Sequence, residues 1–395
     1  MQDNARVEFA NSLRGLAAIA VLISHYFGLF WTHPDVIAGL INSPVLFVGQ
    51  SGIPAYVWWL NAVPIFNWGA YGVALFFLIS GFVIPFSLTG ARAGAFCISR
   101  VLRIVPAHAV GFSICLLALW ICTVYFAVPW PYRAGDILVH YFPGMRDILS
   151  SPSIDGIIWT LEIEIKFYIL CAIFIGWFRG GSLKVFLIPI ALFALLAWLN
   201  QHVSAWSNSA PTAFRHSMTI IFCSQYIIFM FVGVALHYLH KRRISALNAG
   251  FAIIGLFGLF CLQWWMGPHS ASFNIALSYG CALATFVLAY AYPRFFRANP
   301  VFDFLADISY PLYVIHGVAG YVALRLLLDQ GCKAWLALTL VTSGVLLAAW
   351  LLHRLIEKPS QTLGRRLARR IETQAPMIMR WPARHRAAVA DSAAL

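Results

Sequence analysis

Residues 68–90 read WGAYGVALFFLISGFVIPFSLTG, an apolar run of 23 residues without a charged side chain. An α-helix rises about 1.5 Å per residue, so about 20 apolar residues are needed to cross the hydrocarbon core of a bilayer. A helix is stable there because it satisfies its own backbone hydrogen bonds. This run therefore predicts a transmembrane helix.

The whole chain has the composition of a protein that lies mostly in lipid. Of its 395 residues, 61% are hydrophobic and 10% are charged, and the mean hydropathy is +0.79. Soluble domains carry about 25% charged residues, so this chain has too few to cover its surface in water. We expect an all-α integral membrane protein of about ten transmembrane helices. The predicted spans are at about 10–31, 68–90, 105–128, 157–178, 184–200, 217–239, 247–266, 272–292, 308–328 and 335–356.

The basic residues are distributed unevenly around these spans. With the N-terminus in the cytoplasm, 21 of the 27 Lys and Arg residues fall in inner segments and five in outer segments, while Lys166 lies within a span. Cytoplasmic loops of membrane proteins carry an excess of Lys and Arg. The sequence therefore predicts that both termini are cytoplasmic. The same placement explains the net charge of +13 without binding to nucleic acid.

Two segments do not fit the pattern of spans. Residues 41–66 are apolar but are interrupted by three prolines, which disrupt helical hydrogen bonding. We expect an outer loop that lies on the bilayer or caps a cavity, with a re-entrant helix as the alternative. Residues 1–360 are expected to form one membrane domain. Residues 361–395 are expected to form a basic, disordered cytoplasmic tail, part of which lies against anionic head groups.

Ionisable side chains inside a membrane are costly, and each one is a functional hypothesis. The first span carries Arg14 near its inner end and His25 eleven residues later, which is about 16 Å along the helix axis. Histidine takes and returns a proton near neutral pH, so it can act as a general base or acid. The alternatives are an arginine that reaches to the lipid head groups and a histidine bonded to a neighbouring helix.

The fourth span begins with DGIIWTLEIEIKFY and contains three ionisable groups. Glu162 precedes Lys166 by four residues, so the two share a face and are expected to neutralise each other. Glu164 lies about 200° round the helix from Glu162 and needs a partner from elsewhere. Its depth is expected to match that of His25, whose tautomer a carboxylate would fix. The alternative for Glu164 is a structural contact between helices.

The third span begins with RVLRIVP, in which Arg100 and Arg103 share a face at the inner entrance. Arginine forks match phosphate oxygens, although ordinary positive-inside charge is the alternative. The ninth span begins with DISYPLYVIHG, and its polar residues favour a helix that lines a cavity. Hydrogen bonding between helices is the alternative there. These polar residues are Ser309, Tyr310, Tyr313 and His316.

The sequence holds no GxSxG, Walker A, HExxH or Rossmann motif, and its eight cysteines have neither disulfide nor metal-ligand spacing, so no metal is expected. The segments above resemble the acyltransferase-3 family of integral-membrane O-acyltransferases over about residues 7–360. Asn11 stands where an aspartate is common in the family, and Thr160 replaces a serine. The motifs that carry the resemblance, in order, are FANSLRGLAAIAVLISHY, GVALFFLISGFVIPF, RVLRIVP, WTLEIEIKFY, ISYPLYVIH and IEKP.

The resemblance implies an enzyme of the inner cell membrane that moves an acyl group from cytoplasmic acyl-CoA to a hydroxyl of an envelope or exported glycan. Acetyl-CoA is the expected donor substrate, with succinyl transfer as an alternative, and no tightly bound cofactor is expected. The catalytic residues would be His25, as general base or acyl carrier, and Glu164 as its partner. The donor phosphates would bind Arg100 and Arg103, with Arg14. The expected cavity residues are Tyr168, Ser309, Tyr310, Tyr313 and His316.

Other functions are compatible with the same residues. The acceptor could be a macrolide-like molecule or a lipid instead of a glycan. A transporter or flippase of a glycan or small solute would also hold polar helices around a cavity near the middle of the membrane. A sensor or scaffold without chemistry is the third class. Activity that persists after His25 and Glu164 are replaced would favour that class.

Overall fold

The computed structural model describes residues 2–47, 53–60, 66–268, 270–297 and 299–374. Within these ranges the regular structure is helical and no strand is present. Seven stretches are long and apolar enough to cross a membrane, and a pair of helices bent by 64° adds an eighth when it is counted as one span. The chain is therefore an all-α multi-pass membrane protein, as expected.

Each of the ten predicted spans is helical over most of its length. Two of them, α8 and α14, are not among the eight and have 16 and 18 residues. The helices that contain the predicted spans are α1 (Gln2–Leu22), α5 (Trp68–Leu88), α6 (Ala93–Tyr125), α8 (Ile158–Ile173), α9 (Ile175–Arg179), α10 (Leu187–His202), α12 (Pro211–His240), α13 (Ala246–Met266), α14 (Asn274–Ala291), α15 (Pro300–His316), α16 (Val318–Asp329) and α17 (Ala334–Leu352).

Shorter helices extend or connect these elements. They are η1 (Ile23–Leu29), α2 (Phe30–Thr32), α3 (Pro34–Ile41), α4 (Ala55–Leu60), α7 (Ala134–His140), η3 (Leu183–Phe186), η4 (Val203–Ala205), α11 (Trp206–Ser209), η5 (Ser270–Ser272), η6 (Pro293–Phe295), η7 (His353–Glu357) and α18 (Lys358–Gln374).

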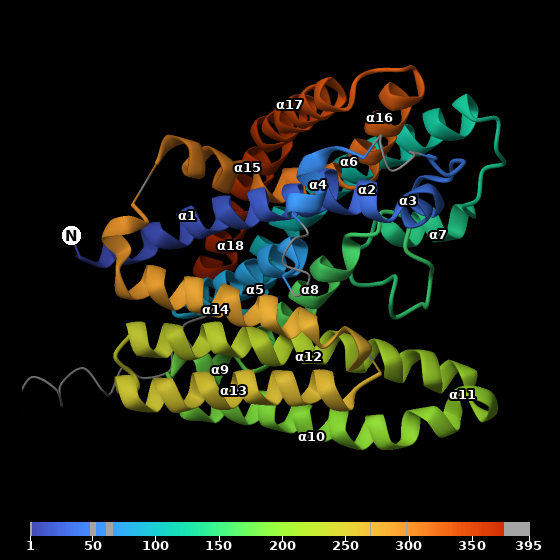
Figure 1. Cartoon of the computed structure of the whole chain (residues 1–395). Coiled ribbons are helices and arrows are strands. Elements are labelled where there is room, and N and C mark those ends of the chain that lie inside the picture. The colour runs from blue at the N-terminus through green and yellow to red at the C-terminus, as the bar shows by residue number, and fades with distance from the viewer. Residues whose placement is uncertain (1, 48–52, 61–65, 269, 298, 375–395) are drawn as a thin grey trace, which may run out of the picture.

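The long helices form two groups with α1 between them (Figure 1). One group packs α5, α8, α10, α12, α13 and α14 around a core that includes Phe82, Phe229 and Phe286. The other packs α6, α15, α16 and α17 around a core that includes Phe112 and Tyr321. Helix α1 contacts both groups, through α5 and α15. Polar side chains on α1 therefore lie at the boundary between two apolar cores.

Two glycines allow α5 and α12 to pack closely. A Cβ atom on Gly81 would lie 2.0 Å from the carbonyl oxygen of Met230, and one on Gly233 would lie 2.4 Å from that of Leu78. Small residues are enriched where membrane helices meet, because they let the two backbones approach each other. This contact holds α5 against the larger helix group.

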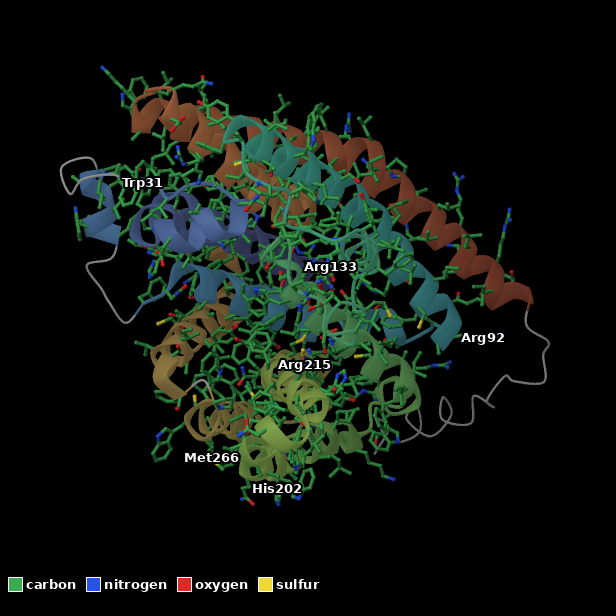
Figure 2. All side chains as sticks on the ribbon, turned by 90° about the vertical axis from the view of Figure 1, so that its right-hand side faces the viewer. Trp31, Arg92, Arg133, His202, Arg215 and Met266 are labelled. Atoms are coloured by element: carbon green, nitrogen blue, oxygen red, sulfur yellow. The ribbon has the colours of Figure 1, made fainter. Side chains whose placement is uncertain are left out.

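We call the end of the molecule where α1 begins the proximal end, and the end that carries α3, α7 and α11 the distal end (Figure 1). Figure 2 views the molecule from the distal end, where Arg133 and Arg215 are labelled. Helices α5 and α14 run opposite to α1. The ring of Phe9, early in α1, contacts Phe82 and Phe286 near their ends, at 5.7 and 5.4 Å.

Helix α15 ends at His316 and α16 begins at Val318, with a bend of 64° at Gly317. The carbonyl oxygen of His316 at this bend accepts a hydrogen bond of 2.7 Å from the hydroxyl of Tyr26. Gly320 leaves room for that hydroxyl, because a Cβ atom there would lie 1.8 Å from Tyr26 Oη. The bend thus brings His316 beside the segment that follows α1.

The segment expected to form an outer loop, 41–66, contains the six-residue helix α4. Residues 42–47 are irregular, and no helix in the described part of the segment is long enough to span a membrane. Residues 48–52 and 61–65 lie outside the described residues. The described part is therefore consistent with a loop that carries one short helix.

The disorder expected for 361–374 is wrong, because these residues belong to α18. This helix packs along α6, where Gly364 approaches the side chain of Leu102. Its arginines lie on the exposed side while its smaller residues meet α6. Tertiary contact with α6 thus stabilises a segment whose composition alone suggests disorder. Residues 375–395 of the expected tail lie outside the described residues.

Candidate active site

His25 lies in the π-helical segment η1, into which α1 continues. Single π-turns within α-helices are frequent at functional sites. The Nδ1 atom of His25 lies 2.5 Å from the hydroxyl of Tyr321 on α16, and the two rings stack with centroids 5.7 Å apart. The ring of His316 packs edge-on against His25 at 4.7 Å. His25 is therefore positioned by one residue on each side of the break between α15 and α16, His316 and Tyr321.

Glu164 does not contact His25, which corrects the predicted pairing. Its Oε1 atom accepts hydrogen bonds from the hydroxyls of Ser80 on α5, at 2.7 Å, and Tyr168, at 2.5 Å. The carboxylate of Glu164 is thus turned toward α5, whereas the ring of His25 is bonded to α16. The two groups belong to different parts of the site.

The expected ion pair between Glu162 and Lys166 is also wrong. Glu162 is 1% exposed and binds Arg146 through both carboxylate oxygens, at 2.9 and 2.5 Å. Lys166 forms its ion pair with Asp147. Both partners lie between α7 and α8, so helical spacing alone could not reveal them. These pairs fasten that segment to α8 and leave neither Glu162 nor Lys166 free for chemistry.

A cavity of about 100 Å³ lies between α1, α5, α6, α8 and α15, and we call it the arginine cavity. Arg14 from α1 and Arg103 from α6 line it, together with Glu164 and Tyr168. Neither guanidinium group forms a hydrogen bond or an ion pair with another described residue. Glu164 in the same cavity and Glu357 attract the Arg14 guanidinium without an ion pair, so both arginines keep hydrogen-bond donors that an anionic ligand could use.

Arg100 does not line this cavity, although the sequence places it beside Arg103. Its Nη2 atom donates to the hydroxyl of Ser87 at 2.8 Å. Its guanidinium group lies over the rings of Phe96 and Tyr168, at 5.3 and 5.4 Å from their centroids. The structure thus brings Arg14 and Arg103 together at the cavity and places Arg100 behind Tyr168.

Three of the four polar residues predicted to line a cavity on α15 lie at the arginine cavity, and His316 does not: the three are Ser309, Tyr310 and Tyr313. The hydroxyl of Tyr310 donates to the carbonyl oxygen of Ile104 on α6 at 2.9 Å. The hydroxyl of Tyr313 lies 2.7 Å from that of Thr160 on α8. Helix α15 is therefore bonded to both α6 and α8 across the cavity.

His316 lies beside Tyr313, with ring centroids 5.5 Å apart, as expected for residues three positions apart on a helix. Its Nδ1 atom is 3.0 and 2.8 Å from the carbonyl oxygens of Leu312 and Tyr313. Carbonyl oxygens only accept, so this network assigns the proton to Nδ1. The Nε2 atom is buried without a partner among the described residues. His316 thus has an unprotonated ring nitrogen without a hydrogen-bond partner among the described residues, and its ring packs against that of His25.

A second cavity, of about 450 Å³, is lined by His25 and Tyr321, and we call it the histidine cavity. The rest of its lining comes from Leu29, from α3 with Asn42 after it, and from residues 131–132 and 153–157 near the distal end. Asp155 and Ile157 line both cavities. Two of the three predicted anion-binding arginines, Arg14 and Arg103, and the predicted base therefore lie in two cavities that share a wall.

Sequence reasoning missed several polar residues of these cavities, among them Tyr321, Asp155 and His108. Tyr321 stands in an apolar run, and no local pattern marks it. Asp155 precedes the fourth predicted span, where a carboxylate is an ordinary helix cap. His108 lines the arginine cavity, and its Nε2 atom bonds the carbonyl oxygen of His140 at 2.8 Å. His108 is an ionisable residue inside a predicted span, a signal that could have singled it out.

A multi-pass helical membrane protein with two adjoining polar cavities is the class that this fold and site define. The chain belongs to the acyltransferase-3 family, whose model is described as an acyltransferase domain and matches residues 7–354. It is thus a membrane acyltransferase. Nodulation protein 10 of Rhizobium leguminosarum bv. viciae is 27% identical over 346 residues, which cover 79% of this chain and 88% of that protein. No solved structure matches the chain significantly.

Proposed function

We propose that the protein transfers an acyl group, acetyl in the first instance, from acyl-CoA to a hydroxyl of an envelope or exported glycan. One observation carries this proposal. Two unpaired arginines, Arg14 and Arg103, line a cavity that shares a wall with the cavity of His25. A donor that carries phosphates can then approach from the arginine cavity, and an acceptor that carries a hydroxyl can approach from the cavity of His25.

The donor binds through its phosphate groups at the arginine cavity. Coenzyme A carries a pyrophosphate and a ribose phosphate, and arginine forks hold phosphate oxygens with two parallel hydrogen bonds. Arg14 and Arg103 have free donors for this purpose. Arg100 keeps Tyr168 in place, and Tyr168 in turn bonds the carboxylate of Glu164.

The acyl transfer uses His25 as a general base. When Nδ1–H donates to the oxygen of Tyr321, Nε2 is free to accept a proton. The acceptor oxygen attacks the thioester carbonyl carbon, so a C–O bond forms and the C–S bond breaks. His25 takes the hydroxyl proton and returns it to the sulfur of coenzyme A. The products are an O-acyl ester and free coenzyme A.

In the proposed orientation the protein lies in the inner cell membrane, with its proximal end on the cytoplasmic side. The excess of Lys and Arg in alternate loops supports this orientation, because such loops stay on the cytoplasmic side. The donor then comes from the cytoplasmic pool of acyl-CoA. The histidine cavity, near the distal end, faces exported glycans.

The test measures glycan O-acetylation in cells that express the wild-type protein, His25→Ala or His202→Ala at matched membrane levels. His202 lies at the end of α10 and is exposed at the distal end, which makes it a control for loss of an imidazole (Figure 2). Base-labile acetyl esters on extracted envelope and exported glycans are counted by mass spectrometry. We expect esters with the wild type and with His202→Ala, and at least a hundredfold fewer with His25→Ala.

Equal ester levels in all three strains would show that His25 is not catalytic. If none of the strains forms acetyl esters on any glycan, the assignment of donor or acceptor is wrong. Succinyl esters and acylated lipids are then sought in the same extracts. Movement of a glycan across the membrane without consumption of acyl-CoA would instead indicate a transporter.

A further inference from the structure

We propose that the histidine cavity is the acceptor site and that it binds a polyhydroxylated sugar through Asp155, in the wall that the two cavities share. This inference rests on the proposed function, because it names the binding site and the chemical class of the acceptor. It also assigns a role to a residue outside the predicted site.

The histidine cavity has the size and lining of a ligand site. Its volume of about 450 Å³ lies within the range of about 300–1,000 Å³ that is common for small-molecule pockets. Its polar lining includes Asn42, Tyr132 and Ser153 besides Asp155. Val36, at 50% exposure, is part of its rim, so the cavity reaches the surface of the molecule.

Asp155 is a buried residue that uses only one of its two carboxylate oxygens in hydrogen bonds with described residues. The residue is 2% exposed. Its Oδ1 atom caps α8 by accepting hydrogen bonds from the backbone N–H groups of Ile157 and Ile158, at 3.1 and 3.0 Å. Its Oδ2 atom has no partner among the described residues. Because Asp155 lines the cavity, a ligand that supplies a hydrogen-bond donor to this oxygen is stabilised there.

This free oxygen selects for a hydroxyl-rich acceptor. A carboxylate only accepts hydrogen bonds, and sugar hydroxyls are donors that suit it. A lipid chain or an apolar macrolide face would cover Asp155 without supplying a donor, at a cost in binding. One hydroxyl of the sugar then donates to Asp155, while another donates to His25 and becomes the oxygen that is acylated. The class of acceptor is therefore a saccharide with at least two free hydroxyls.

A change at Asp155 is expected to affect binding of the acceptor and not binding of the donor. Asp155 lines both cavities, but Arg14 and Arg103, where the donor phosphates bind, line the arginine cavity alone. In Asp155→Asn the amide oxygen keeps the helix cap, because asparagine caps helices as well as aspartate does. The variant replaces only the free oxygen by an NH₂ group, which cannot accept a hydrogen bond from a hydroxyl group.

The experiment uses the full-length purified protein in detergent, so that both cavities are accessible. The acceptor probe is glycan extracted from cells that lack the protein, and the donor is acetyl-CoA. Initial rates of ester formation give separate KM values for glycan and for acetyl-CoA. The matched control is Asp35→Asn, an exposed carboxylate on α3 that does not line the cavity.

We expect Asp155→Asn to raise the KM for the glycan about tenfold or more, with the KM for acetyl-CoA within twofold of the wild-type value. Asp35→Asn is expected to change neither. An unchanged glycan KM in Asp155→Asn would overturn the inference and leave the acyltransferase proposal intact. An equal rise in both KM values would show a structural role for Asp155 and would also overturn it. If the wild type acetylates a lipid extract but no glycan, both proposals fail.

Discussion

The partner of His25 is a tyrosine and not a carboxylate. The hydroxyl of Tyr321 lies 2.5 Å from His25 Nδ1 and has no other hydrogen bond with a described residue. Tyr321 is fully buried, and its ring stacks on the imidazole with an interplanar angle of 11°. A second group that orients the base is a recurrent feature of catalytic sites. Here that group comes from a different helix, 296 residues further along the chain.

We expect Tyr321→Phe to lower kcat about tenfold, because one hydrogen bond that orients His25 is lost. The KM for acetyl-CoA should stay unchanged, since the arginine cavity does not include this residue. Steady-state kinetics of the purified protein measure both constants. Tyr56→Phe is the matched control, because the hydroxyl of Tyr56 is buried without a partner. An unchanged kcat in Tyr321→Phe would mean that His25 is oriented by other contacts.

The arginines of this molecule differ in what they bind. Arg146 and Arg325 form ion pairs, with Glu162 and Asp329, whereas Arg100 bonds the hydroxyl of Ser87 and no carboxylate. Arg14 and Arg103 form no ion pair or hydrogen bond within the described residues and line one cavity. Their guanidinium groups therefore keep donors for a ligand, which the other three use to hold the fold.

At the scale of elements, helix packing explains the positions of the site residues. Helix α5 supplies Ser80 to the carboxylate of Glu164, and its neighbour Gly81 contacts the backbone of α12. Consecutive residues of a helix point about 100° apart, so these two face different sides of α5. Close packing on one side thus sets the distance at which Ser80 meets Glu164 on the other.

We expect Gly81→Ala to destabilise the protein by about 1–3 kcal/mol, because the added methyl group overpacks a backbone contact. Its Cβ atom would lie 2.0 Å from the carbonyl oxygen of Met230, so α5 and α12 must separate. Thermal unfolding in detergent checks this as a lowered Tm. Gly255→Ala in α13 is the control, since nothing lies within 4 Å of a Cβ atom there. Equal Tm values for the two variants would contradict the close contact.

At the scale of the whole molecule, the two helix groups meet along α1 (Figure 1). The arginine cavity is lined by residues of both groups, and the histidine cavity lies toward the distal end. On the proposed function, the donor binds at the arginine cavity and the acceptor at the histidine cavity, on the two sides of their shared wall.

The proposed orientation makes a prediction for the whole chain. A reporter that is active only outside the cytoplasm, fused after residue 395, should be inactive, because the basic segments stay inside. The same reporter inserted between α7 and α8, at Ser150, should be active, since this segment is near the distal end. Enzyme activity of both fusions in intact cells measures this. An active C-terminal reporter would reverse the orientation and with it the assignment of the donor side.

Much of the fold was predictable because hydropathy is a property of neighbouring residues. A run such as 68–90 must be helical in a bilayer whatever lies beside it, since no other partner satisfies its backbone. The local sequence also places the ionisable residues Arg14, His25, Arg103 and Glu164 within or at the ends of apolar runs, where a charge is costly and indicates a functional role. Sequence by itself therefore determined the class of fold and singled out several of the polar residues that line the cavities.

Tertiary structure decided how those residues are paired. The π-helical segment η1 changes the direction of His25 from that of a regular helix, and the bend at Gly317 brings Tyr321 to it. Glu164 then bonds to Ser80 and Tyr168, far from the imidazole. Such pairings depend on the packing of helices that are distant in the chain, and no local pattern of spacing or hydropathy encodes them.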